Sequence, residues 1–78
     1  MQRWTKKQAT ERKKLIRSAA HVMWASVPAG AVPDKRDAHA ALRDLTQFGP
    51  WAEIGDIAED RGTWGRLVSD TLRASRAF

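Results

Sequence analysis

The sequence predicts an all-α domain, a small bundle of about four helices whose last two are joined by a tight turn. Three observations predict this fold. Apolar residues recur at helical spacing over four separate stretches. Prolines and glycines fall between these stretches, where they break a helix. The chain of 78 residues has no cysteine, so we expect one domain, spanning 1–78, that helix packing alone holds together.

The first helix is predicted over residues 5–27. The run VPAGAVP ends it, because two prolines around a glycine cannot continue a helix. One side of this helix is apolar along its whole length and is expected to face the core. That stripe consists of Ala9, Leu15, Ile16, Ala19, Ala20, Val22, Met23 and Val27.

The opposite side of this helix is basic, with Lys13, Lys14 and Arg17 among its residues. Arg17, His21 and Trp24 follow one another at i, i+4 and i+7, and so form a row. A basic surface with an aromatic residue suits phosphate groups or an acidic partner. The alternative interpretation is a solvated lysine face, with Trp24 covered by a neighbouring helix.

The second helix is predicted over residues 34–48. Asp34 is its expected N-cap, and Asp37 stands three residues later, in the capping-box position. Gly49 and Pro50 end the helix. Apolar residues at helical spacing mark one buried face. These residues are Ala38, Ala41, Leu42, Leu45 and Phe48.

The third helix is predicted over residues 50–61, since proline is well accommodated in a first helical turn. Trp51 begins its core face and is expected to meet Trp64 of the following helix in the core. The other side is acidic and should turn away from a polyanion. It carries Glu53, Asp56, Glu59 and Asp60.

The fourth helix is predicted over residues 63–75, after a tight turn centred on Gly62. A glycine suits the left-handed conformation that ends many helices. Thr63 follows it and has a hydroxyl that can cap the next helix. Because so few residues separate the two apolar stripes, we expect the third and fourth helices to fold back on each other as a helix-turn-helix.

Four residues around this turn match a known pattern. Ile57 and Ala58 form an apolar-Ala pair, Gly62 follows four residues after the alanine, and Val68 is a β-branched residue six further on. In this respect the stretch from Ile57 to Leu72 resembles the helix-turn-helix family of DNA-binding proteins, of which the lac repressor class is an example. The resemblance implies that the last helix presents its polar side to duplex DNA.

The stretch departs from the family pattern at three places. Arg61 and Thr63 stand where apolar residues flank the turn glycine, and Thr71 stands where the second helix buries an aliphatic side chain. In the implied complex, Arg66 and Ser69 lie nearest base edges, and the terminal arginines contact phosphate. The predicted DNA-binding residues are Arg66, Ser69, Asp70, Arg73 and Arg76, together with Lys13, Lys14 and Arg17.

The net charge of +5 is unevenly distributed. Residues 1–30 carry seven Lys/Arg and one acid, residues 31–60 carry three and seven, and residues 61–78 carry four and one. We therefore expect duplex DNA to approach through the first and last helices. A regulator of the phage or bacterial type would use this arrangement in the cytoplasm of a bacterial or phage-infected cell, as a dimer, because one short helix offers few base contacts.

No catalytic or metal-binding pattern emerges, so we expect neither enzymatic activity nor a cofactor. The two histidines, His21 and His39, fall on different predicted helices without a carboxylate at matching spacing. The serines lack the surroundings of a nucleophile elbow. No apolar run reaches the roughly 20 residues of a membrane span, so a membrane is not an expected partner.

Two other hypotheses remain open from the sequence. One is a non-enzymatic protein-interaction module that binds and modulates a larger protein through Trp4, Trp24, Arg17 and His21, because exposed tryptophans are favoured interface anchors. The same tryptophans would equally hold a homodimer together. The other hypothesis is nonspecific nucleic-acid binding through the lysine-rich N-terminal region.

Overall fold

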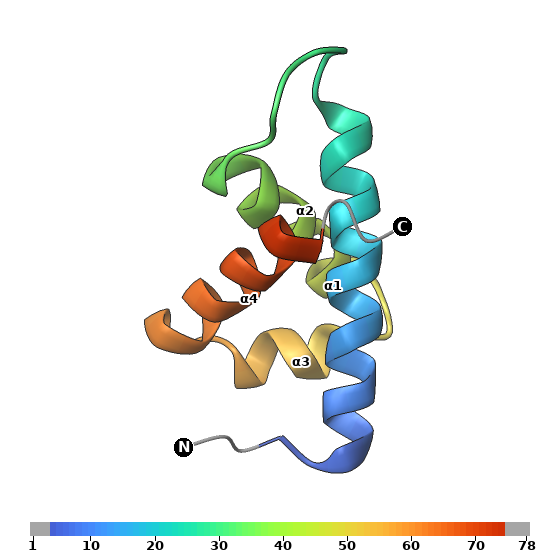
Figure 1. The fold of residues 1–78 in the computed structure, drawn as a ribbon. Helices are drawn as coiled ribbons and strands as arrows, with labels where there is room; N and C mark the ends of the chain where they lie inside the picture. The colour runs from blue at the N-terminus through green and yellow to red at the C-terminus, as the bar shows by residue number, and fades with distance from the viewer. Residues whose placement is uncertain (1–3, 75–78) are drawn as a thin grey trace.

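The structure is a computed structural model that describes residues 4–74, apart from the side chain of Phe48. Within that range the chain folds into four α-helices and no strand, the all-α bundle that the sequence predicts. α1 is a long rod, and the other three helices lie along one side of it (Figure 1). The elements are α1 (Lys6–Ser26), α2 (Lys35–Phe48), α3 (Ala52–Ile57) and α4 (Arg61–Ala74).

The first two helices begin at side-chain caps. The Thr5 hydroxyl accepts a hydrogen bond from the backbone N–H of Gln8 at 3.1 Å, and the Gln8 side chain accepts one from the Thr5 N–H at 3.0 Å. Asp34 and Asp37 form the same reciprocal pair at the start of α2, as predicted. The hydrogen bond from the Asp37 backbone N–H holds the pKa of Asp34 below its ordinary value. These caps satisfy donors that a first helical turn leaves free, and so they define where each helix begins.

The core is one cluster of apolar side chains from all four helices and the α3–α4 turn. Val22 was predicted to join it but is 38% exposed, since it lies roughly 90° around α1 from the centre of the buried stripe, at about 100° per residue. The predicted core residue Phe48 has its side chain outside the described part. The buried cluster consists of Leu15, Ile16, Ala19, Met23, Ala38, Ala41, Leu42, Ile54, Ala58, Leu67 and Val68.

The connection between α1 and α2 contains the left-handed glycine of the described chain. Gly30 has a φ of 85°, and no other residue in the range 4–74 has a positive φ. The Ala31 N–H donates to the Pro28 carbonyl at 3.0 Å. This bond closes a β-turn whose third position needs a positive φ, which glycine adopts without strain.

The turn between α3 and α4 lies at residues 58–60, so the prediction of a turn at Gly62 is wrong. Gly62 lies in the first turn of α4 with a negative φ. Asp60 takes the capping role expected of Thr63: its carboxylate Oδ2 accepts from the Thr63 backbone N–H and from the Thr63 hydroxyl, both at 3.0 Å. Because the cap lies three residues earlier, α4 begins at Arg61, and α3 ends before the predicted position.

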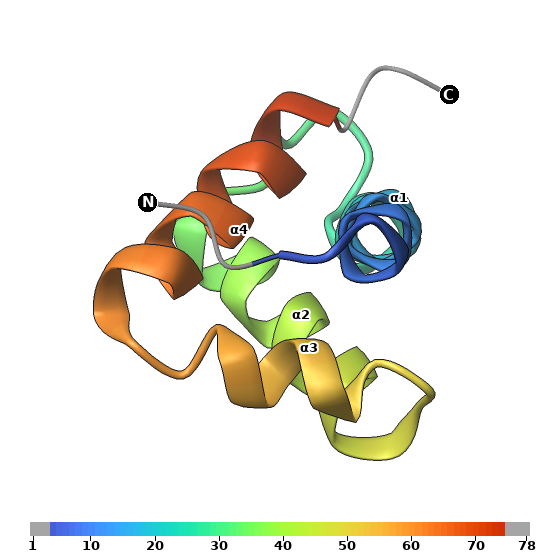
Figure 2. The ribbon, with the colours of Figure 1, turned by 90° about the horizontal axis from the view of Figure 1, so that it is seen from below.

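α3 and α4 do not fold back on each other. Each packs against α2 and α1, and they barely touch one another (Figure 2). α3 lies close against α2 at Gly55, where an added Cβ would lie 2.8 Å from the Cβ of Thr46. Among the described residues no ring contact joins Trp51 to Trp64, contrary to prediction. The Trp64 indole N–H instead donates to Nδ1 of His39 on α2 at 2.6 Å, with the two rings edge-to-face.

Candidate nucleic-acid interface

α4 has one buried side and one exposed side. Leu67, Val68 and Thr71 are buried against the other helices. The Thr71 hydroxyl donates to the Leu67 carbonyl at 2.7 Å, so this polar side chain is satisfied in the core, where an aliphatic residue was expected. The exposed side, called here the outer face of α4, follows the spacing i, i+3, i+4, i+7, i+11. It consists of Gly62, Gly65, Arg66, Ser69 and Arg73.

Arg66 and Arg73 give this outer face its positive charge. Both side chains are exposed, and no acidic side chain among residues 4–74 pairs with either of them. Seven residues separate them, which is roughly 10 Å along the helix axis at about 1.5 Å per residue. Glu59 and Asp60 bound the N-terminal end, so the positive part is the middle and C-terminal half of α4. The predicted contact Arg76 lies outside the described residues.

Asp70 does not belong to this outer face, although the sequence placed it there. Its carboxylate accepts a hydrogen bond from Nη2 of Arg12 on α1 at 2.5 Å. The Arg12 side chain is only 15% exposed, and its guanidinium carbon lies 5.8 Å from the centre of the Trp4 ring. The ion pair joins α1 to α4 and pairs the one acidic side chain of α4, which stays 37% exposed, with a cation of α1.

Sequence reasoning missed Arg12, yet a signal for it exists. Leu15, Ile16 and Ala19 follow Arg12 at i+3, i+4 and i+7, and all three are buried. A charged residue that continues an apolar stripe faces the same neighbours as the stripe. Such a position calls for a buried partner of opposite charge, because an unpaired buried charge is costly.

Two glycines of the outer face have no packing role in the fold. An added Cβ at Gly65 would meet nothing within 4 Å, and one at Gly62 would meet only the Asp60 carboxylate at 3.5 Å. Gly65 therefore does not make room for a packed side chain such as a tryptophan. Glycine in a helix costs about 0.8–1.0 kcal/mol relative to alanine. What these glycines do provide is an uncovered backbone that another molecule can approach closely.

The exposed Lys and Arg side chains of α1, together with His21, form a second basic surface, the lysine face. Among residues 4–74, the one acid that pairs with its lysines is Glu11, whose carboxylate lies 3.8 Å from the Lys14 ammonium. An exposed pair at that distance contributes little. The predicted contacts on α1 are thus accessible. The lysine face consists of Lys6, Lys7, Lys13, Lys14, Arg17 and His21, all exposed.

The lysine face and the outer face of α4 do not form one surface. Arg12 marks the side of α1 that meets α4, and it lies roughly 160° around the helix from the centre of the lysine face, at about 100° per residue. Asp70 marks the side of α4 that meets α1, and it lies roughly 80° from the centre of the outer face of α4. The lysine face therefore points away from α4, which lies beside α1 on the side that Arg12 marks (Figure 2). The predicted common approach of one polyanion to both helices is corrected to two separate surfaces.

The residues of the predicted partner-binding surface do not form one exposed surface either. Trp4 and Trp24 are half-buried and pack against the core, so neither projects as an exposed anchor. Arg17 and His21 are exposed on the lysine face. The structure thus favours the interpretation in which Trp24 is covered by a neighbouring helix.

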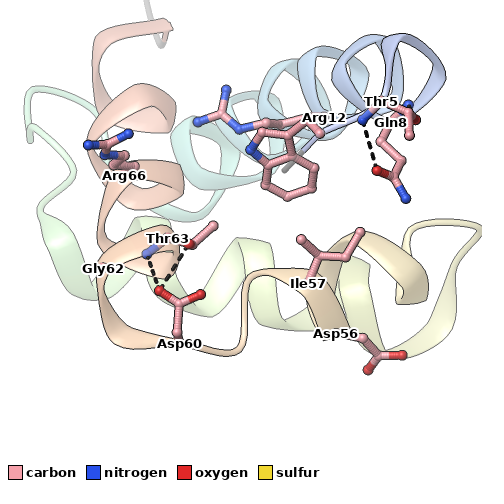
Figure 3. A pocket seen from close by; sticks show the side chains of 10 residues that line it. Thr5, Gln8, Arg12, Asp56, Ile57, Asp60, Gly62, Thr63 and Arg66 are labelled. Atoms are coloured by element: carbon pink, nitrogen blue, oxygen red, sulfur yellow. Dashed lines mark hydrogen bonds between the residues drawn. The ribbon is translucent and has the colours of Figure 1, made fainter. Parts of the chain in front are cut away.

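A cleft of about 820 Å³ lies beside the outer face of α4. Figure 3 shows Arg12 and Arg66 along one edge and the carboxylates of Asp56 and Asp60 along the other. The cleft is lined by Trp4, Thr5, Gln8, Arg12, Asp56, Ile57, Asp60, Gly62, Thr63 and Arg66. Because both signs of charge line it, the cleft by itself does not select an anion. Arg66 borders both the cleft and the outer face of α4.

Across residues 4–74, no three His, Asp or Glu side chains gather as metal ligands would, and no helix has the length and apolar character that crossing a bilayer requires. We find no match of the chain to a known protein family, to a curated protein or to a solved structure.

Proposed function

We propose that this protein binds duplex DNA through the outer face of α4, as a small regulator of the bacterial or phage type. The observation that carries the proposal is the pair Arg66 and Arg73, exposed and without an acidic partner in the described chain. An arginine that no internal carboxylate occupies can present its planar fork to a guanine edge or a phosphate. Gly65, the residue before Arg66, faces open space and supports the same interpretation.

The outer face of α4 suggests a role for each of its polar side chains. A helix with its side chains is about 10–12 Å wide and fits a major groove of about 12 Å. Arg66 and Ser69 lie in the middle of the exposed stripe, where they would reach base edges. Arg73 lies about one helical turn beyond Ser69 and would contact phosphate. Glu59 and Asp60 repel phosphate at the N-terminal end, so the middle of α4 is expected to lie closest to the bases.

The proposed DNA-bound form is a dimer. α4 has 14 residues, and one helix of that length reaches only a few base pairs. Two copies reading two half-sites would double the number of contacts, as in dimeric helix-turn-helix proteins. Preferred sequences are therefore expected to contain paired half-sites.

Selection of preferred duplexes from a random pool, followed by affinity measurement on the selected site and its single-base variants, tests the proposal. Arg66→Ala is expected to lose about 1–3 kcal/mol of discrimination at one base position. Arg43→Ala is the matched control, because Arg43 is an exposed arginine that belongs to α2 and not to the outer face of α4. It removes the same charge and should leave the discrimination intact.

Equal effects of Arg66→Ala and Arg43→Ala on every sequence would reject base readout by α4. Absence of any salt-dependent affinity for duplex DNA would reject the proposal as a whole. A pull-down from lysate with and without nuclease then addresses the protein-interaction hypothesis, because a protein partner is retained after the nucleic acid is digested.

A further inference from the structure

The lysine face of α1 is a second basic surface that the proposed contact through α4 does not use. Five exposed Lys/Arg side chains lie on it, and Glu11 at its edge is the one acid that pairs with any of its lysines in the described chain. From Lys6 to Arg17 the row extends roughly 16 Å along the axis, at about 1.5 Å per residue. The surface is thus an extended row of positive charge rather than a single cationic site.

Its chemistry suits phosphates in a regular row. Duplex DNA carries about one negative charge per 1.7 Å of its axis, and lysines neutralise phosphates as point charges without reading bases. The apolar side of α1, with Leu15 and Met23, is buried in the bundle. It is therefore not available to insert into a lipid surface, as the apolar side of a membrane-binding helix would be.

One straight duplex cannot occupy both basic surfaces. The lysine face points away from α4, on the side opposite to Arg12 and its pairing with Asp70. DNA has a persistence length of about 50 nm, so it is rigid over the dimensions of a domain this small. A duplex that lies along the outer face of α4 leaves the lysine face free for another segment.

We infer that the lysine face holds a second duplex segment by its phosphates, so that one protein molecule bridges two duplexes. The inference rests in part on the proposed function, because the outer face of α4 holds the first duplex. The two contacts differ in kind: the contact through α4 depends on sequence, and the contact through α1 depends on charge alone.

A capture assay tests the bridge. One duplex carrying the selected site is fixed to beads, a second labelled duplex of unrelated sequence is added, and its retention is measured across protein concentrations. The wild-type chain is expected to retain the second duplex at intermediate concentration and to release it in excess, when each duplex is saturated separately. The lysine-face variant carries Lys7→Gln, Lys13→Gln and Lys14→Gln. The matched control carries Lys35→Gln, Arg36→Gln and Arg43→Gln, exposed cations of α2.

The lysine-face variant is expected to bind the selected duplex with its sequence preference intact, but to capture the second duplex roughly tenfold less or worse. The α2 control should still capture it. Equal melting temperatures of the two variants and the wild type establish that all three are folded, which surface lysine changes should permit.

The outcomes separate this inference from the proposed function. Sequence-dependent binding that requires Arg66, without capture of a second duplex by the wild type, overturns the bridge alone. Undiminished capture by the lysine-face variant also overturns it, since a surface other than the lysine face would then hold the second duplex. No binding of either duplex removes both proposals. Tighter binding of the lysine face to phosphatidylserine vesicles than to duplex DNA would assign this surface to lipid and overturn the bridge.

Discussion

The packed contacts between helices and the outer face of α4 use the same residue types under opposite conditions. At the α2–α3 contact, Gly55 lies against Thr46, whereas Gly65 faces open space. At the α1–α4 contact, Arg12 is mostly covered and ion-paired, whereas Arg66 is exposed and has no acidic partner in the described chain. Packing within the fold accounts for Gly55 and Arg12. It does not account for Gly65 or Arg66. This difference is what directs attention to the outer face of α4 as a surface for another molecule.

The largest effect is expected where a glycine is packed. Gly55→Ala should destabilise the protein by about 1–3 kcal/mol, because the new Cβ would overlap the branched Cβ of Thr46 and push α3 from α2. Denaturant unfolding measures this as a lower midpoint at unchanged slope. Wild-type stability of this variant would show that α3 moves freely away from α2, and the contrast between the two glycines would be lost.

A smaller effect is expected at the ion pair between α1 and α4. Arg12→Met keeps much of the side-chain length but leaves Asp70 without its partner, which should cost about 1–2 kcal/mol. Arg66→Met should change stability by no more than about 0.5 kcal/mol, as for other surface positions. A double-mutant cycle with Asp70→Asn measures the coupling between the pair. Equal losses from Arg12→Met and Arg66→Met would contradict the distinction between the covered and the exposed arginine.

The smallest effect, and the only gain, is expected at the exposed glycine. Gly65→Ala should stabilise the protein by up to about 1 kcal/mol, because alanine is the better helix former and its Cβ meets no other atom. The same change should weaken binding to the selected duplex if close backbone approach matters. A variant that is more stable and binds equally well would remove Gly65 from the proposed interface.

Much of the fold could be predicted from the sequence because its signals are local. The cap residues Thr5 and Asp34 lie within three residues of the groups they bond, so the starts of α1 and α2 follow from short patterns. The α3–α4 turn could not be placed in this way. Asp60 and Thr63 are both good capping residues, and Gly62 suits a turn as well as an exposed first helical turn. The packing of both helices on α2 decides between them.

The candidate site likewise has one part that the sequence predicts and one part that it does not. The exposure of Arg66, Ser69 and Arg73 follows from helical periodicity, because it is set by the buried residues of the same helix. Helical periodicity does not predict that Asp70 lies off the outer face of α4 and pairs with α1. Its partner Arg12 lies 58 residues away in the chain, and no local pattern joins two residues at that separation.

The sequence by itself determined that this chain is helical, where its first two helices begin, and that its ends are basic, because propensity, capping and composition act over a few residues. Only the tertiary structure decided which acid pairs with which arginine and which way each basic face points. Those features depend on how far each helix is rotated about its own axis when it packs against the others, and that rotation is set by contacts between residues distant in the chain.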